Sequence, residues 1–272
     1  MRYWARFCEP INWEKKMNAI KGIAVMSMVA TMASAGYQAL EFTKAESISD
    51  DSGATLAYQI FVPANVPADK KIPLVLFLHG AGERGNDNTN QVKHGAMDLI
   101  RYAQSNEAAV IIFPQCPKDK KWAEVNWNAP SHTMPEQPSS SMALIFKLLE
   151  EKTNKLPIDK SRIYVTGISM GGYGTWDILQ RKPGYFAAAM PICGGGDLAG
   201  APIMKSTPIW TVHGDQDKAV PVSRSRDMVA ALKACEGNIQ YTEIPGAGHD
   251  VWTRTYADIS MIKWLFSQRL KK

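Results

Sequence analysis

A short glycine-flanked segment contains the residue types of a serine nucleophile. It reads Gly167-Ile168-Ser169-Met170-Gly171, and it follows a mostly apolar run, Arg162–Thr166, that is typical of a buried strand. A helix is expected directly after it. A serine at such a strand-to-helix turn is held in a strained conformation, and the positions two before and two after it have no room for bulky side chains. The two glycines meet that demand, so the segment predicts that Ser169 attacks a carbonyl carbon.

A serine hydroxyl needs a neighbouring base to take its proton, and only two histidines lie downstream of Ser169. His249 lies in a glycine-containing loop directly after the last expected strand, whereas His213 ends the strand before it. We therefore predict that His249 is the base. We interpret His213 as a structural residue that bonds to backbone at the strand end.

The loop that begins at His213 contains two candidate acids for orienting the base, Asp215 and Asp217. An acid that lies beyond the turn can reach the far ring nitrogen of the histidine. We therefore favour Asp217 as the acid and expect Asp215 to cap the loop. Asp250 adjoins His249, but adjacent side chains point apart, so we interpret Asp250 as structural.

A tetrahedral oxyanion needs two preorganised N–H donors. The N–H of Met170, directly after the serine, is the first candidate. The second candidate is Ala81, with Gly82 as the alternative, in the glycine-rich segment 79–85 that follows the apolar run Ile72–Leu78.

Three polar residues of segment 79–85 have structural interpretations. His79 is expected to brace the loop. Glu83 and Arg84 are expected to form a local ion pair that fixes the loop, with binding of a substrate carboxylate as the alternative.

Several residues near these positions are candidates for the walls of a substrate cavity. They are Gly82, Trp122 and Trp127 in the proline-rich segment 114–138, and Trp252 after the expected base. Aromatic walls suit an acyl or aryl group. A connection as long as segment 114–138 is unusual in a compact domain unless it has a function.

The chain contains neither H-E-x-x-H nor C-x-x-C, so we predict no metal site.

Apolar runs and helical stretches alternate along most of the chain. Before them, segments 43–49 and 55–62 predict an antiparallel hairpin around Asp50-Asp51-Ser52-Gly53. The alternation predicts an α/β fold, with a mostly parallel, doubly wound sheet and helices on both faces. Ligands of such sheets bind beyond the carboxyl ends of the strands, where the candidate residues lie. The further expected strands are Ile72–Leu78, Ala109–Phe113, Arg162–Thr166, Ala187–Ile192, Ile209–Val212 and Gln240–Ile244, and the expected helices are Met97–Gln104, Ser140–Lys152, Met170–Gln180, Arg224–Ala234 and Asp258–Arg269.

Four segments carry a resemblance to a known family: His79–Gly85, Gly167–Trp176, Pro191–Asp197 and His213–Pro221. Together they resemble one group of bacterial α/β-hydrolases, labelled phospholipase/carboxylesterase-like or predicted peptidase, that is similar to feruloyl esterases and polyhydroxyalkanoate depolymerases. The resemblance implies an α/β-hydrolase fold, a triad of Ser169, Asp217 and His249, and no cofactor. In the loop of His249 the match is looser.

The expected activity is that of a serine carboxylesterase acting through an acyl-enzyme. Short-chain or aryl/hydroxycinnamoyl esters are the expected substrates, as small molecules or linked to polysaccharide, since no apolar lid helix suited to long lipid chains is evident. A peptidase or amidase of the same fold and an inactive binding module are the alternatives. The sequence predicts neither the physiological ester nor the oligomeric state.

The charge of the chain argues against a nucleic-acid partner. The net charge is +5 over 272 residues, but residues 1–35 contain five basic and two acidic side chains, which leaves +2 for the remainder. An excess this small and scattered is no electrostatic footprint for nucleic acid.

Residues 1–35 are predicted to be a leader with a secretory signal peptide. The leader contains, in order, a positively charged region, a short apolar stretch and a small-residue cleavage site: Lys15, Lys16 and Lys21, then Ile23–Ala30, then Ala33-Ser34-Ala35. The apolar stretch is shorter than the roughly 20 residues that a membrane span needs. We therefore expect no stable membrane insertion after processing.

Cleavage near Ala35/Gly36 would leave residues 36–272 as a single catalytic domain that is secreted or periplasmic. The translation start is either Met1 or Met17, because residues 1–16 do not resemble the start of a signal peptide. Outside the leader the chain contains three cysteines, Cys116, Cys193 and Cys235. An odd number allows at most one internal disulfide, and the sequence does not choose among the pairings or exclude that none forms.

Overall fold

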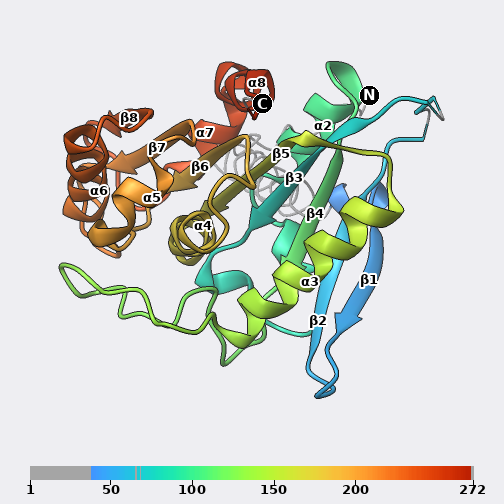
Figure 1. The fold of residues 1–272 in the computed structure, drawn as a ribbon, viewed down its shortest axis with the longest axis horizontal. Helices are drawn as coiled ribbons and strands as arrows, with labels where there is room; N and C mark the ends of the chain where they lie inside the picture. The colour runs from blue at the N-terminus through green and yellow to red at the C-terminus, as the bar shows by residue number, and fades with distance from the viewer. Residues whose placement is uncertain (1–37, 65, 68, 271–272) are drawn as a thin grey trace, which may run out of the picture.

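The computed structural model describes residues 38–64, 66–67 and 69–270, and the expected signal peptide lies outside them. Within these ranges eight strands form one sheet, in the order β1-β2-β4-β3-β5-β6-β7-β8 (Figure 1). The strands are β1 (Lys44–Ser49), β2 (Thr55–Phe61), β3 (Ile72–Leu78), β4 (Val110–Gln115), β5 (Ile158–Ile168), β6 (Ala188–Ile192), β7 (Ile209–Gly214) and β8 (Ile239–Ile244). The α-helices are α2 (Ala96–Ser105), α3 (Ser140–Lys155), α4 (Met170–Arg181), α5 (Ala201–Met204), α6 (Ser223–Ala234), α7 (Trp252–Ala257) and α8 (Ile259–Ser267).

The sheet is antiparallel at one edge and parallel elsewhere. β1 pairs with β2 as the expected hairpin, and β2 pairs antiparallel with β4. From β4 to β8 all neighbours are parallel. The chain moves from β3 to β4 on one side and then returns to place β5 on the other side of β3. This reversal is the topological switch point at which such sheets bind ligands, so the loops after β3 and β5 are where a site is expected.

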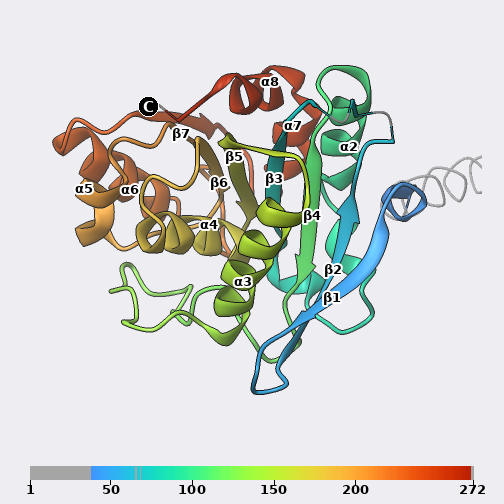
Figure 2. The same ribbon diagram turned by 45° about the vertical axis from the view of Figure 1, so that its right-hand side comes forward.

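Helices cover both faces of the sheet, as predicted (Figure 2). Successive side chains of a strand point to opposite faces, and the fully buried β3 shows this directly. Leu74, Leu76 and Leu78 pack in the core with α3, α4 and α6. Val75 and Phe77 pack in a second core with α2, α7 and α8. A strand buried on both faces therefore reads as a continuous apolar run.

The structure differs from the expected elements mainly at their ends. β5 begins four residues before the expected Arg162, and the short helices α5 and α7 were not predicted because neither is long enough to show a helical period. Residues 116–139 between β4 and α3 contain no helix or strand, as expected for this segment.

Two further properties concern the described ranges only. No helix in them is long and apolar enough to span a bilayer. Cys116, Cys193 and Cys235 are all free thiols, so none of the disulfides that the sequence allowed among them is formed.

Candidate active site

Ser169 occupies the sharp turn between β5 and α4. Its backbone has φ 52° and ψ −114°, a conformation that residues other than glycine rarely adopt. Such strain costs on the order of 1–3 kcal/mol and persists only where the surroundings fix it. Here the Ser169 N–H donates to the Ile192 carbonyl of β6 at 2.9 Å, which ties the turn to the neighbouring strand.

The glycines on either side of the serine are required because backbone carbonyls crowd this turn. A Cβ on Gly167 would lie 2.4 Å from the Gly171 carbonyl oxygen. A Cβ on Gly171 would lie 1.9 Å from the carbonyl oxygen of Leu78, the last residue of β3. The structure therefore shows the steric demand that the glycine spacing predicted.

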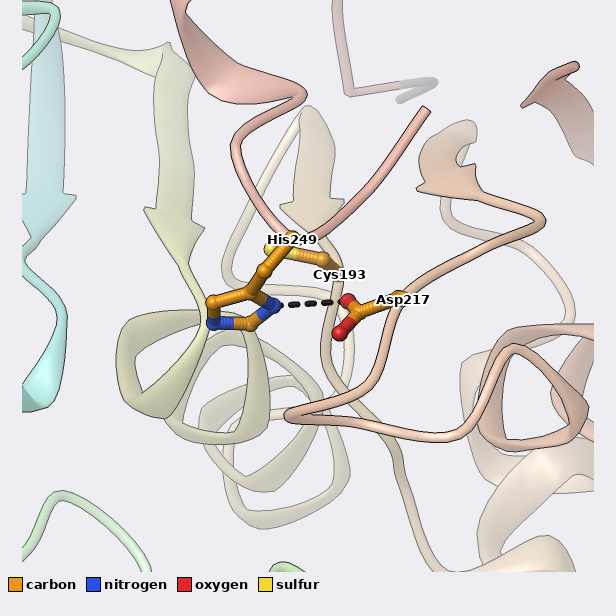
Figure 3. Close-up of side chains that lie close together, drawn as sticks. All are labelled: Cys193, Asp217 and His249. Atoms are coloured by element: carbon orange, nitrogen blue, oxygen red, sulfur yellow. Dashed lines mark hydrogen bonds and ion pairs between the residues drawn. The ribbon is translucent and has the colours of Figure 1, made fainter. Parts of the chain in front are cut away.

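His249 lies between Ser169 and Asp217. Its Nε2 is 2.9 Å from the Ser169 Oγ, and its Nδ1 is 2.6 Å from the Asp217 Oδ2 (Figure 3 shows the second contact). The three residues follow β5, β7 and β8, so all three leave the same edge of the sheet. Because a carboxylate accepts at Nδ1, the Nδ1 carries the proton and Nε2 is free to accept the hydroxyl proton of Ser169.

The carboxylate of Asp217 is buried and fully hydrogen-bonded. Its Oδ1 accepts from the N–H groups of Ala219 and Val220 at 2.8 and 2.9 Å. Its Oδ2 accepts from His249 and also from the His213 Nε2 at 3.1 Å. Burial raises the pKa of Asp217, but the hydrogen bonds from the two histidines and from backbone outweigh it and hold that pKa well below its ordinary value. Asp217 is therefore ionised throughout the neutral range.

The two other aspartates that the sequence offered lie in structural positions. Asp215 accepts from the Gly246 N–H at 2.7 Å and so links the loops after β7 and β8. Asp250 accepts from the Thr253 N–H and hydroxyl, next to the start of α7. Neither contacts the His249 ring, which matches the structural interpretation of both.

His213 makes a contact that sequence reasoning missed. Its Nε2 lies 3.0 Å from the Val220 carbonyl oxygen, which is the backbone bond expected, but also 3.1 Å from Asp217. Its Nδ1 lies 2.7 Å from the hydroxyl of Ser225 on α6. The four-residue spacing of His213 and Asp217 within one tight loop was the available signal for this contact.

The two candidate oxyanion donors each begin a helical turn. Met170 is the first residue of α4, and Ala81 is the first residue of the 3₁₀ turn Ala81–Glu83. The first N–H groups of a helix have no acceptor within it, so neither N–H is used by its own helical turn. Ala81 and Gly82 line the same cavity as Ser169.

His79 braces the loop after β3, as expected. Its Nδ1 donates to the Gly80 carbonyl at 2.6 Å, and its Nε2 accepts from the Cys116 N–H at 2.9 Å. Burial lowers the pKa of His79 to about 4, so the ring is neutral at neutral pH.

Glu83 and Arg84 do not form the ion pair expected between them. In the described part of the chain Glu83 instead lies 3.5 Å from the Nε2 of His94. Arg84 donates through Nε to the Ala81 carbonyl at 3.0 Å. The two side chains still fix the loop, but each does so through a partner that the sequence did not indicate.

A cavity of 370 Å³ opens over Ser169 and His249. Trp127 from the long connection and Trp252 from α7 both line it, together with Gly82. The Trp252 ring meets the His249 ring edge-on, with centroids 5.2 Å apart. A larger hollow of 680 Å³ next to α3 is lined by neither serine nor histidine, so we assign the chemistry to the smaller cavity.

The structure places Trp122 in the core and not in the cavity wall. Its side chain is fully buried, and its indole N–H donates to the His79 carbonyl at 3.0 Å. A Cβ on Gly174 would lie 2.6 Å from the Trp122 Cβ, so the residue packs directly against α4. Trp122 and Trp127 lie in the same irregular segment, which has no helical or strand period. The sequence therefore could not show that Trp122 is buried in the core while Trp127 lines the cavity.

One cluster of possible metal ligands coincides with this site. The Sγ of Cys193, a carboxylate oxygen of Asp217 and a ring nitrogen of His249 lie within 4.8 Å of one another, and Figure 3 shows the three side chains. Burial raises the pKa of the Cys193 thiol well above its ordinary value, which disfavours the thiolate that a metal needs. Since the carboxylate and the imidazole are already bonded to each other, the geometry fits a proton-sharing pair better than a metal site.

Comparison with known proteins points to one family. The family model described as Phospholipase/Carboxylesterase matches residues 63–263. A solved structure described as a thermostable esterase is 37% identical and superposes with a TM-score of 0.77, over 84% of this chain and 64% of that one. A ferulic acid esterase of 18% identity shares the fold, with a TM-score of 0.62 over 82% of this chain and 97% of that one.

A curated relative is larger than this chain. The bifunctional acetylxylan esterase/xylanase XynS20E of Neocallimastix patriciarum is 22% identical over 167 residues. The match covers 61% of this chain but 22% of the relative, so it concerns one part of a longer protein. With the family match over most of its length and the fold in agreement, the chain belongs to the phospholipase/carboxylesterase family of α/β-hydrolase-fold hydrolases.

Proposed function

We propose that the protein is a serine carboxylesterase in which Ser169 is the nucleophile, His249 the general base and Asp217 the acid that orients the base. The observation that carries this proposal is the continuous hydrogen-bonded series from the Ser169 hydroxyl through His249 to Asp217. A serine hydroxyl next to an imidazole, itself held by a buried carboxylate, is the arrangement that activates serine for acyl transfer.

The proposed reaction has two stages. Oγ of Ser169 attacks the ester carbonyl carbon while Nε2 of His249 takes its proton, and the N–H groups of Met170 and Ala81 bind the oxyanion, with Gly82 as the alternative to Ala81. The alcohol leaves with the proton from His249, and an acyl-enzyme remains. Water then gives a proton to His249 and attacks the acyl carbon, which releases the acid and restores Ser169.

The proposed substrates are short-chain or aryl/hydroxycinnamoyl esters, as small molecules or linked to polysaccharide. The cavity beside Ser169 has tryptophan walls, Trp127 and Trp252, and a volume suited to a small acyl or aryl group. The names of two similar proteins, an acetylxylan esterase/xylanase and a ferulic acid esterase, point the same way. We further propose that the enzyme is exported, with the catalytic domain in residues 36–272.

A substrate panel tests this proposal. Purified residues 36–272 and a Ser169→Ala variant are assayed with p-nitrophenyl esters of increasing chain length, methyl ferulate, acetylated xylan and matched p-nitroanilides. We expect hydrolysis of short-chain or aryl esters that is lost in Ser169→Ala. Turnover of the anilides in preference to the esters would instead indicate an amidase or peptidase.

A further inference from the structure

The second histidine bound to Asp217 has no role in the mechanism above. His213 and Ser225 are both fully buried. They continue the hydrogen-bond network into the core. Asp217 contacts the imidazole of His213, His213 contacts the Ser225 hydroxyl, and the Ser225 Oγ lies 3.2 Å from the Gly194 carbonyl oxygen. Buried polar series of this kind are costly unless each member has a partner, and here each does.

The partners of His213 fix where its proton lies. Its Nε2 faces two oxygens that only accept, the Asp217 carboxylate and the Val220 carbonyl, so Nε2 carries a proton. Its Nδ1 faces the Ser225 hydroxyl, which both donates and accepts. The Nε2–H that points at Asp217 is therefore present whether the ring is neutral or charged.

We propose that His213 is a positioning residue that acts through Asp217: its Nε2–H holds the carboxylate oxygen that accepts the hydrogen bond from the His249 Nδ1–H, and it disperses the charge on that oxygen. This inference rests on the proposed function. Asp217 shares one oxygen between two imidazoles while two backbone N–H groups hold the other, so the carboxylate cannot rotate without breaking several bonds. The Asp217 carboxylate is thus fixed in position, and the hydrogen bond from His213 weakens the negative charge that His249 faces.

Titratable groups on three other elements face the Asp217–His249 pair. Cys193 after β6 and Tyr173 of α4 are both neutral at neutral pH, because burial raises the pKa of each. Asp250 adjoins His249, but its carboxylate accepts from the N–H and hydroxyl of Thr253 in the first turn of α7. Of these groups none donates a hydrogen bond to Asp217 in the described structure, so His213 is the side chain that, besides His249, holds this carboxylate.

Glu243 of β8 faces His213 from the neighbouring strand, where the two residues are paired in register. Hydrogen bonds from Arg226 and Tyr241 lower the pKa of Glu243 to about 2. This carboxylate is thus ionised and already paired, and its charge stays constant over the range in which the enzyme would be assayed.

Two substitutions separate the hydrogen bond from the space that the ring fills. His213→Gln keeps an N–H near the position of Nε2, whereas His213→Met has a similar volume and no donor. Thr211→Val is the matched control, since it removes another buried hydrogen bond of β7, to the Pro191 carbonyl, and leaves Asp217 untouched. For each variant we would measure the pH profile of kcat/KM, kcat and KM with p-nitrophenyl acetate, and Tm.

In His213→Met we expect kcat to fall on the order of 10- to 100-fold with KM little changed. Losses of this size are typical when a side chain that only orients a functional side chain is removed, as known for the hydrogen-bond partners of metal ligands. The midpoint of the acid limb should rise by about half to one pH unit, since a less stabilised carboxylate holds the proton on His249 more strongly. In His213→Gln both kcat and the midpoint of the acid limb should stay close to the wild-type values. Thr211→Val should lower Tm without moving the acid limb.

The proposal is overturned if His213→Gln and His213→Met shift the acid limb equally, or if neither shifts it. A second readout keeps this inference separate from the proposed function. The low-field ¹H NMR signal of the proton between His249 and Asp217 should move in His213→Met and not in His213→Gln, whether or not p-nitrophenyl acetate is turned over. An unchanged signal in His213→Met would contradict the inference, while an inactive wild-type protein would contradict only the esterase function.

Discussion

The Oδ2 of Asp217 lies 2.6 Å from the Nδ1 of His249, although 32 positions separate the two residues in the chain. They meet because β7 and β8 are adjacent and parallel, with Gly214 paired to Ile244 at their ends, so that the following loops leave the sheet together. A Cβ on Gly214 would lie 2.3 Å from the Gly248 carbonyl oxygen, so a glycine is needed for the two loops to approach. The contact is therefore a product of strand order and of one small residue.

Replacing Asp217 by asparagine should nearly abolish turnover. In the proposed mechanism the carboxylate orients His249 and stabilises the imidazolium that forms in the transition state. The corresponding substitution in a serine protease with the same three residue types costs about 10⁴-fold in kcat. We expect a loss of roughly 10³- to 10⁴-fold in kcat for Asp217→Asn, with little change in KM. Steady-state kinetics with a p-nitrophenyl ester measures both.

Asp215→Asn is the matched control, because it changes the same chemical group in the same loop. Asp215 bonds to the Gly246 N–H and does not contact His249, so its loss should cost roughly tenfold or less in kcat and lower Tm. A large loss of kcat in Asp215→Asn, together with nearly wild-type kcat in Asp217→Asn, would show that the acid is assigned to the wrong residue.

Adding one methyl group at Gly171 should disrupt the turn that holds Ser169. The added Cβ would overlap the Leu78 carbonyl, and backbone atoms on both sides cannot rotate away as a side chain can. We expect Gly171→Ala to lose about 3 kcal/mol or more in the free energy of unfolding. Chemical denaturation measures this.

Gly248→Ala serves as its control, since a Cβ at that position would meet no atom within 4 Å. It should unfold at nearly the wild-type denaturant concentration. Equal stability of Gly171→Ala and Gly248→Ala would contradict the close approach of α4 to β3.

The folded protein should lose stability as the pH falls from about 6.5 toward 4. Burial lowers the pKa of His79 to about 4, whereas the same ring in the unfolded chain titrates near its ordinary 6.5. The unfolded state thus binds a proton in this window that the folded state does not, and the stabilisation present above the window is lost below it. For His79 the loss is about 3 kcal/mol.

His79→Gln removes the titrating ring while its amide oxygen can still accept from the Cys116 N–H. Urea unfolding at pH 7 and pH 4 should therefore show a smaller difference for His79→Gln than for the wild type. The same difference in both proteins would show that His79 is not the source of this pH dependence.

Export should leave a mature chain that begins at or near Gly36. N-terminal sequencing of protein secreted by a bacterial host checks this directly. Recovery of an exported chain that begins at Met1 or Met17 would contradict the proposed signal peptide.

All eight strands could be predicted from the sequence because each physical signal was local. The strands buried on both faces are continuous apolar runs, such as Ile72–Leu78, and the hairpin has polar turn residues between two strand patterns. The turn at Ser169 was predictable because its steric demand requires glycines at fixed positions.

The remaining features depend on contacts between segments far apart in the chain. The pairing of Glu83 with His94 and the burial of Trp122 against α4 depend on how irregular loops pack. Such loops show no hydrophobic periodicity from which these contacts could be predicted. The bond from His213 to Asp217 was missed because a strand-end histidine has an equally good partner in backbone.

The most direct test of the account is covalent labelling by a serine-directed phosphonate, followed by intact mass measurement and peptide mapping. Ser169 lines the cavity, and its hydroxyl lies 2.9 Å from the Nε2 of His249, which Asp217 holds. Ser225, which lies beside His213, is fully buried, so Ser169 should react with one equivalent. The label should map to Ser169, and it should be absent from Ser169→Ala that retains the wild-type circular dichroism spectrum. A label on any of Ser139–Ser141, or undiminished labelling of Ser169→Ala, would contradict the assignment of Ser169 as the nucleophile.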